Sequence, residues 1–404
     1  MIALDRKRKK IISDVVLSLM SSVIPIMVLQ LFVLPGVSRK VGGNVYGMVL
    51  TIISFITVLP GSFGNVFNNI RLLKQTDYEE EGQEGDFNVL YLISCPINLI
   101  AFIIFAYLYH FDITLSDAIL IIIVALLVTA YEYLNVAFRI TLDFASTFIC
   151  NVILSAGYCL GFGLFSLIGV WPLIYLTGYF LALVYICYKS NIWKEKIQIT
   201  PMFRGTLSES IMLLGAGLVA RTITYADKFL IYPILGGNEV SIYYAASVIG
   251  KIISMMISPI SSVLLSYLAK MKNQKNKLFW GTFGVSAGVG VVGYFLCLLA
   301  SRFILQFLYP QYLDVAITYI PITTATAVII ALSAIMNPFV LRFMSMKWQV
   351  GINAVTLGIY VVLCLGMLNL FGMIGFCWGV LISNLVKLVT ILLIYSIKSK
   401  GVKE

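Results

Sequence analysis

Two long stretches of this chain contain no charged residue. Neither Phe144 to Tyr188 nor Trp348 to Val386 includes an Asp, Glu, Lys or Arg. A helix that crosses the ~30 Å hydrocarbon core of a membrane needs about 20 apolar residues, so each stretch is long enough for two crossings. A chain that is 60% hydrophobic and 11% charged also lacks the polar residues to cover a soluble core. The sequence therefore predicts an integral membrane protein.

The predicted membrane spans are helices, because a helix satisfies its own backbone hydrogen bonds in lipid. Strands of a membrane barrel would instead alternate apolar and polar residues over short stretches. We predict an all-α fold with tight turns at 169–172 and at 369–372. Its twelve transmembrane helices cover approximately residues 11–34, 45–66, 88–110, 115–138, 144–168, 172–188, 207–233, 240–268, 279–301, 315–341, 348–369 and 373–397.

The links between these spans alternate between basic and nearly uncharged. Cytoplasmic links of membrane proteins collect Lys and Arg. The odd-numbered links hold only Arg39, Lys40 and Arg302. This distribution places both termini in the cytoplasm. The basic cytoplasmic links also explain the net charge of +10, so no nucleic-acid partner is needed to account for it. The basic residues of the termini and the even-numbered links are Arg6, Lys7, Arg8, Lys9, Lys10, Arg71, Lys74, Arg139, Lys189, Lys194, Lys196, Arg204, Lys270, Lys272, Lys275, Lys277, Arg342, Lys347, Lys398, Lys400 and Lys403.

A polar stretch near the middle divides the predicted spans into two groups of six. We predict an N-terminal six-helix lobe at 1–190, a cytoplasmic linker at 191–206 and a C-terminal six-helix lobe at 207–404. Parallel repeats of six helices are a common transporter plan, with the substrate site between the repeats. Each half carries a Gly-Gly-Asn turn, then a tyrosine, then a proline inside the next helix: Gly42–Asn44, Tyr46 and Pro60, then Gly236–Asn238, Tyr243 and Pro259.

The prolines at matching places in the two halves are hinge candidates. A proline inside a helix removes a backbone hydrogen bond and permits a bend. We therefore predict hinges at Pro60 with Gly61 and at Pro259.

One segment, 77–86, is strongly acidic. We interpret it as a solvated cytoplasmic loop, and the alternative is a regulatory or partner-binding role. Its acidic residues are Asp77, Glu79, Glu80, Glu81, Glu84 and Asp86.

Four basic side chains lie inside predicted spans, where each ionisable group costs about 2.5–3.5 kcal/mol on insertion scales. At about 1.5 Å per residue, Arg221 and Lys251 both fall near the middle of the membrane, on the two helices of one hairpin. We predict that Arg221, Lys251, Lys228 and Lys387 line a cationic cavity that binds an anion such as a pyrophosphate. Arginine would supply bidentate contacts and lysine a point charge.

Asp227 allows two interpretations. It pairs with Lys228 or Lys251 for structural reasons, or it binds H⁺ or Na⁺ and couples transport to an ion gradient. No metal site is predicted, because the one histidine, His110, and the cysteines lack metal-ligand spacing.

Two further ionisable residues have local explanations. Lys387 lies one turn from Ser383 and Asn384, which could solvate its ammonium group instead of a ligand. Glu132 lies near the inner end of the fourth predicted span, and we expect its side chain to reach toward Arg139.

Several segments resemble one known family. Arg39 to Gly47 resembles the turn between the first two helices of polysaccharide repeat-unit flippases, which belong to the multidrug/oligosaccharidyl-lipid/polysaccharide exporter superfamily. The segments 226–230, 243–246 and 259–262 are similar to the seventh and eighth helices of that family. The resemblance implies two lobes in a V around a central cavity, as in MATE transporters. It also implies alternating access and a cargo of undecaprenyl-pyrophosphate-linked oligosaccharide, which crosses the bacterial cytoplasmic membrane in a pathway shared with a polysaccharide polymerase and glycosyltransferases.

The alternatives are an ion-coupled multidrug or small-molecule antiporter on the same fold and an integral-membrane polymerase or glycosyltransferase. Lipid II flippases carry arginines in the first helix, whereas residues 15–34 hold none. Exporters of cationic drugs favour acidic cavities, whereas the intramembrane charges here are mostly basic. Catalysis is disfavoured because the longest outer link, 302–314, offers only Arg302 and Asp314. We therefore predict a transporter with no catalytic residue and no cofactor beyond an H⁺ or Na⁺ gradient.

Overall fold

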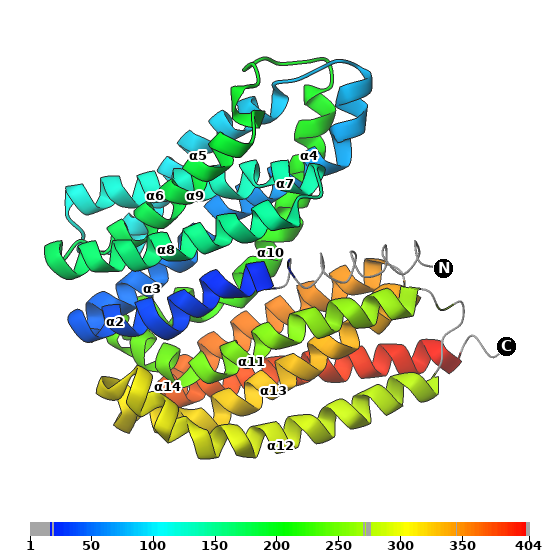
Figure 1. Cartoon of the computed structure of the whole chain (residues 1–404). Coiled ribbons are helices and arrows are strands. Elements are labelled where there is room, and N and C mark those ends of the chain that lie inside the picture. Colours follow the sequence, from blue (N-terminus) through cyan, green and yellow to red (C-terminus); the bar gives the residue numbers. More distant parts are fainter. Residues whose placement is uncertain (1–16, 18–19, 270, 272–275, 345, 401–404) are drawn as a thin grey trace, which may run out of the picture. The chain divides into compact units, whose positions relative to one another are not determined.

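The computed structural model describes residues 17, 20–269, 271, 276–344 and 346–400. Every regular element in these ranges is a helix (Figure 1). The elements are η1 (Leu29–Val33), α2 (Leu34–Lys40), α3 (Gly43–Val58), α4 (Pro60–Glu80), α5 (Asp86–Leu108), α6 (Leu115–Leu134), α7 (Val136–Ile140), α8 (Phe144–Ile168), α9 (Pro172–Lys189), η2 (Ile192–Lys194), α10 (Phe203–Leu235), α11 (Gly237–Ala269), α12 (Asn276–Leu308), η3 (Pro310–Tyr312), α13 (Leu313–Phe343) and α14 (Met346–Lys400). The start of the first predicted span, 11–16, and the basic residues 6–10 lie outside the described residues.

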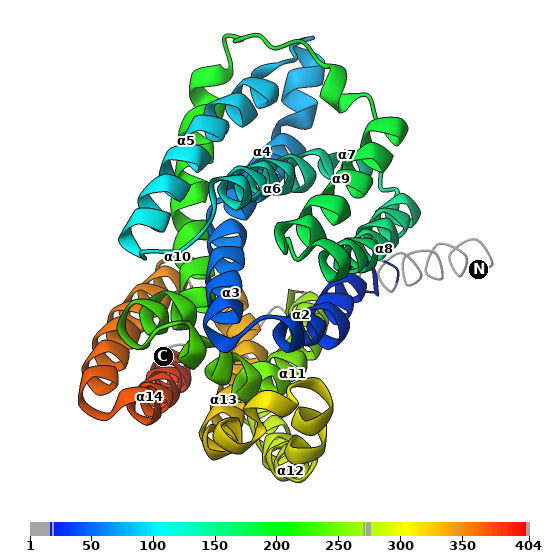
Figure 2. The same cartoon turned by 90° about the vertical axis from the view of Figure 1, so that its left-hand side faces the viewer.

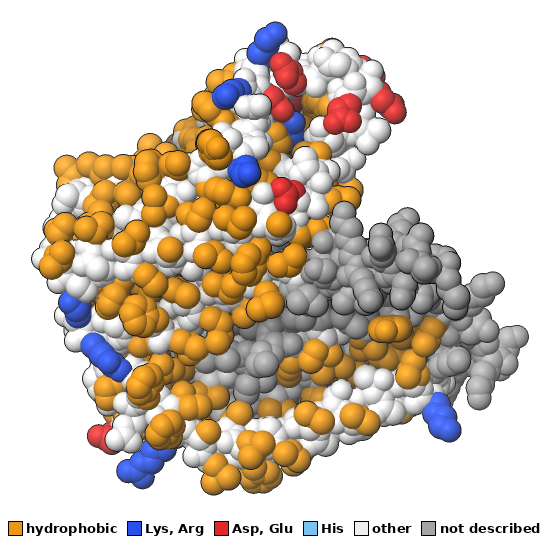
Figure 3. Space-filling view, in the orientation of Figure 1, with side chains coloured by type: hydrophobic (Ala, Val, Ile, Leu, Met, Phe, Trp, Pro, Cys, Tyr) orange, Lys and Arg blue, Asp and Glu red, His pale blue; other side chains and the backbone are white. Residues whose placement is uncertain are grey.

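Ten helices in the described part of the chain are long and apolar enough to cross a membrane, which confirms the all-α membrane class. Hydrophobic side chains cover the sides of the helices in the space-filling view, and the charged side chains in view lie near helix ends (Figure 3). The predicted turn at 169–172 is confirmed, because Gly169 ends α8 with a φ of 84° and Pro172 begins α9. The last two predicted spans lie in α14, where Gly372 interrupts the helix with a φ of 61°. The exact number of spans stays a prediction.

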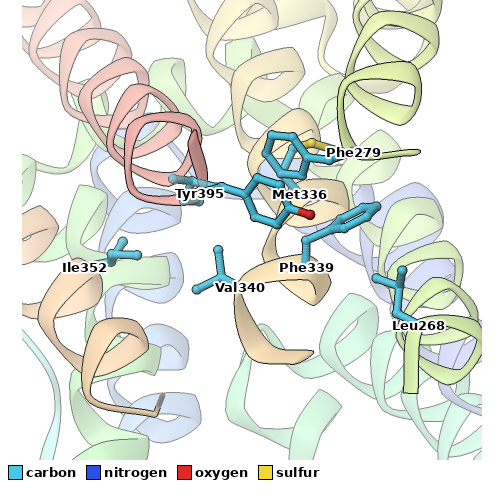
Figure 4. Packing of buried hydrophobic residues seen from close by; sticks show 8 residues of the cluster. Leu268, Phe279, Met336, Phe339, Val340, Ile352 and Tyr395 are labelled. Carbon is cyan, nitrogen blue, oxygen red and sulfur yellow. The ribbon is translucent and has the colours of Figure 1, made fainter. Parts of the chain in front are cut away.

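The chain divides into two compact units, Met1–Pro233 and Ile234–Glu404. In the second unit α13 packs against α11, α12 and α14. A buried cluster of this unit combines aromatic and aliphatic side chains: Phe279 stacks on Tyr395 with ring centroids 3.7 Å apart, and Phe339 meets the Phe279 ring edge-on (Figure 4). The units divide near the end of α10, whereas the sequence placed the boundary between lobes at 191–206.

Nearly all of the helix α10 belongs to the first unit, which forms hydrogen bonds with it near its start and near Phe229. Near its start, the Thr206 hydroxyl lies 2.8 Å from the Tyr78 hydroxyl at the end of α4. Near its other end, the Tyr109 hydroxyl donates a 2.9 Å hydrogen bond to the Phe229 carbonyl. A third contact, in the middle of α10, is part of the site described below.

The predicted linker is fastened to the first unit by buried polar contacts. The Asp86 carboxylate, with none of its surface exposed, accepts hydrogen bonds from the Thr200 backbone N–H at 2.8 Å, the Thr200 hydroxyl at 2.5 Å and the Tyr78 hydroxyl at 2.6 Å. The Arg71 guanidinium donates two hydrogen bonds to the Glu195 carboxylate, at 2.5 and 2.6 Å. Charge-assisted contacts of this kind are among the strongest in proteins. The linker is therefore a structured part of the first unit.

These contacts correct the interpretation of the acidic segment. Asp77 and the four glutamates are exposed, as a solvated segment requires, although α4 continues to Glu80. Asp86 is the exception. It begins α5 and is completely buried, because backbone and hydroxyl donors replace the water that its carboxylate loses.

Close backbone packing joins α8 to α9, which lie side by side (Figure 2). A Cβ atom on Gly157 would lie 2.6 Å from the Gly178 Cα, and one on Gly161 would lie 2.6 Å from the Ile174 Cα. Only glycine fits at such distances. Gly163, on the same helix, has open space where its side chain would be.

Candidate functional site: a small cavity at the break between α3 and α4

The predicted break at Pro60 occurs in the structure and leaves backbone carbonyls at the end of α3. The helix α3 ends at Val58, Leu59 separates the two helices, and α4 begins at Pro60. Proline has no N–H, so it cannot donate to the carbonyl four residues before it. The carbonyls in the last turn of a helix need other partners and favour a nearby cation.

Arg221 supplies that cation from the middle of α10. Its guanidinium Nη1 donates a 2.9 Å hydrogen bond to the Thr57 carbonyl, in the last turn of α3. Gly61 makes room for this contact, because a Cβ atom there would lie 2.8 Å from the same nitrogen. The hinge motion predicted at Pro60 and Gly61 stays a prediction, whereas the structure gives Gly61 a role in admitting Arg221.

Arg221 and Glu132 line the same cavity, which has a volume of about 90 Å³. The two side chains are half-buried. The remaining lining residues are Leu29, Ile53, Ile56, Thr57, Gly61, Val128, Tyr175 and Tyr179. A guanidinium side chain and a carboxyl side chain therefore line one small, largely apolar space inside the first unit.

The structure fixes the position of Glu132 through close packing of α6 against α4. A Cβ atom on Gly64 would lie 2.6 Å from the Glu132 Cβ, so the two helices touch at this point. The Asn68 side-chain amide also donates a 2.8 Å hydrogen bond to the Glu132 backbone carbonyl. Arg139, which we expected to attract Glu132, instead donates to the side-chain oxygens of Asn68 and Asn69. The basic side chain that shares a cavity with Glu132 therefore comes from α10, whereas Arg139 bonds to α4.

Asp227 and Lys228 form a direct pair. The Lys228 ammonium donates a 2.9 Å hydrogen bond to the Asp227 carboxylate, and the two side chains are 5% and 8% exposed. Lys228 also lies over the Tyr225 ring, 5.2 Å from its centroid. This geometry favours charge pairing for Asp227, and a role in ion coupling stays a prediction.

Asp227→Asn is expected to destabilise the protein by about 3 kcal/mol, because it leaves the Lys228 charge buried without its carboxylate. The measurement is thermal unfolding in detergent. Lys228→Gln in the same chain should restore most of the loss, since both groups are then neutral. A double variant as unstable as Asp227→Asn alone would contradict the pairing role.

The other predicted site residues lie in the second unit. The Lys251 ammonium of α11 lies 4.5 Å from the centroid of the Tyr244 ring. Lys387 is half-buried in α14, where the Asn384 side chain donates to the carbonyl of Val380. The backbone at Pro259 lies within α11, and its side chain is outside the described residues. A cavity shared by Arg221 with Lys251 and Lys387 stays a prediction.

The sequence of this chain matches the family described as polysaccharide biosynthesis protein over residues 43–280, more than half of its length. The chain belongs to this family. No curated protein matches it.

Solved structures show that this member of the polysaccharide biosynthesis family has the fold of MOP-superfamily transporters. An inward-facing multidrug resistance transporter of the MATE family is 13% identical, with a TM-score of 0.70 over 95% of this chain and 99% of that one. The lipid II flippase MurJ, in an inward closed conformation, is 14% identical, with a TM-score of 0.69 over 96% of this chain and 87% of that one. An outward-facing MATE transporter is 14% identical, with a TM-score of 0.65 over 96% of each chain. The family and the fold together confirm the resemblance found in the sequence.

Proposed function

We propose that this protein is a flippase. It moves oligosaccharide repeat units, linked to undecaprenyl pyrophosphate, from the inner to the outer leaflet of the bacterial cytoplasmic membrane for the synthesis of a surface polysaccharide. The observation that carries the proposal is the family match over 43–280, on a fold shared with membrane transporters. An arginine inside a membrane helix adds the charge that a phosphorylated cargo would need.

The finer features of the proposal follow the expected transporter plan. Twelve transmembrane helices form two six-helix lobes, both termini are cytoplasmic, and the cargo passes by alternating access. An H⁺ or Na⁺ gradient drives transport. Glycosyltransferases of the same pathway supply the cargo, and a polysaccharide polymerase consumes it. The break at Pro60 supports a bend in the helix pair α3 and α4 during this cycle.

Arg221→Ala is expected to block transport without loss of the protein from the membrane. A charge-assisted hydrogen bond is worth about 1.5–3 kcal/mol, so losing it should slow cargo transfer about 10- to 100-fold. Cells with this variant, like cells that lack the gene, should accumulate undecaprenyl-linked oligosaccharide and lose surface polymer. Lipid extraction with mass analysis measures the first effect, and polymer staining measures the second.

The matched control is Arg302→Ala, which removes an exposed arginine near the outer end of α12 and should leave transport unchanged. Normal surface polymer in the strain that lacks the gene would refute the flippase proposal. Normal polymer in the Arg221→Ala strain alone would remove Arg221 from the cargo site.

A further inference from the structure

We propose that Glu132 acts as a built-in competitor of the cargo's phosphate group for Arg221, and so sets how tightly the transporter holds its cargo. This inference rests on the proposed function and adds to it a residue that controls affinity. It starts from the cavity at the break between α3 and α4, where Arg221 and Glu132 face the same space.

The size of the cavity limits how a phosphate group can reach Arg221. Pockets for drug-sized ligands measure roughly 300–1,000 Å³. The cavity here measures about 90 Å³, which is too small for a sugar. The guanidinium is also already engaged with the Thr57 carbonyl. A phosphate group that binds Arg221 here therefore shares one small space with the Glu132 side chain.

Charge determines which of these interactions opposes the cargo most. The Thr57 carbonyl is a neutral dipole, whereas an ionised Glu132 carboxylate brings a full negative charge to the cavity that Arg221 lines. A phosphate group at Arg221 would meet the like charge of Glu132 at short range. Like charges placed together in a site of low dielectric constant repel each other strongly. Glu132 therefore lowers the affinity of this site for anions.

The packing constrains the two residues differently. The backbone and the Cβ of Glu132 are held by the close approach of Gly64 and by the hydrogen bond from Asn68 to the Glu132 backbone carbonyl. Arg221 reaches the cavity through a long side chain that passes Gly61, where a Cβ atom would be in its way. In this proposal the guanidinium turns from Thr57 and Glu132 toward a phosphate group and returns after release. A transporter needs the guanidinium to return to its resting position, because a cation with no competing anion would keep the cargo bound and prevent its release.

The test measures binding of inorganic pyrophosphate and of undecaprenyl pyrophosphate to the full chain in lipid nanodiscs. Glu132→Gln keeps the size of the side chain and removes its charge. We expect it to bind both probes roughly tenfold more tightly than the wild type, in the range found for close charge pairs. In cells the same variant should transport more slowly despite the tighter binding, because release becomes limiting.

Two further variants make the result specific. Glu209→Gln removes the same charge from a carboxylate that pairs with Lys74 at 2.9 Å near the start of α10, and it should leave the affinity unchanged. In a chain that already carries Arg221→Ala, Glu132→Gln should lose most of its effect, since the competitor then has no guanidinium to compete for. If Glu132→Gln lowers the amount of folded protein, Glu132→Asp replaces it, because the shorter side chain withdraws the charge and should tighten binding severalfold.

The outcomes separate the two proposals. If Arg221→Ala weakens binding of the probes and neither Glu132 variant changes it, the inference about Glu132 is wrong and the cargo site stands. If Arg221→Ala leaves binding of both probes intact, Arg221 is not the phosphate site, and the inference fails together with that part of the proposed function.

Discussion

Asp86→Ala is expected to destabilise the protein by about 5 kcal/mol, enough to remove most folded protein from the membrane. Its carboxylate accepts three hydrogen bonds in a fully buried position, and hydrogen bonds to a charged group are worth about 1.5–3 kcal/mol each. The Thr200 N–H and the Tyr78 hydroxyl would lose this acceptor, and the attachment of the linker to the start of α5 would weaken. The measurements are the amount of membrane-inserted protein and the thermal unfolding temperature in detergent.

Asp77→Ala is the matched control, because Asp77 belongs to the same acidic segment but is exposed. Its effect should lie within about 0.5 kcal/mol, as is usual for surface substitutions. Equal losses in the two variants would show that the net charge of the segment matters, and not the buried contacts of Asp86.

Gly161→Leu should also abolish folding. A Cβ atom at this position would lie 2.6 Å from the Ile174 Cα and 2.7 Å from the Leu173 carbonyl oxygen, so the backbone of α9 itself would have to move. Overpacked cores usually lose about 1–3 kcal/mol when side chains can adjust, and a displaced helix exceeds that range. Because proteins are stable by only about 5–15 kcal/mol, the amount of folded protein should fall sharply.

Gly163→Leu provides the comparison within the same helix. The position has no atom within 4 Å of the added Cβ, so the leucine should be accepted with normal folding. Membrane insertion and detergent stability of the two variants, measured side by side, test whether packing between α8 and α9 sets the difference. Equal damage from both substitutions would mean that the helix does not tolerate leucine for a reason unrelated to α9.

Features with a local cause were predictable from the sequence. The turn at Gly169 and the break at Pro60 occur where expected, because glycine and proline act on the backbone at their own positions. The length and apolarity of the helices likewise follow from the membrane.

Features that depend on partners far apart in the sequence were not predictable. Glu132 was visible as an acidic residue in a predicted span, but Arg139, the nearest basic residue along the chain, bonds to asparagines of α4, and the arginine that shares the Glu132 cavity is Arg221. From the sequence, Asp86 was one acidic residue among several in a predicted loop, because no nearby residue indicates that Thr200 is its hydrogen-bond donor. In both cases the contact is set by which distant segments of the chain touch, and a single sequence does not encode that in any short pattern.

The bonds along α10 have a practical consequence for engineered hybrids. This helix is joined to the first unit at Thr206, at Arg221 and at Phe229. If an ancestral duplication of six helices produced the chain, α10 would be the first helix of the second copy. Its hydrogen bonds nevertheless join it to the first unit, so the boundary of the ancestral copies and the boundary of the compact units lie one helix apart. A chimaera with a related transporter should therefore exchange its halves after Pro233, since a junction at 191–206 would separate α10 from every partner that holds it.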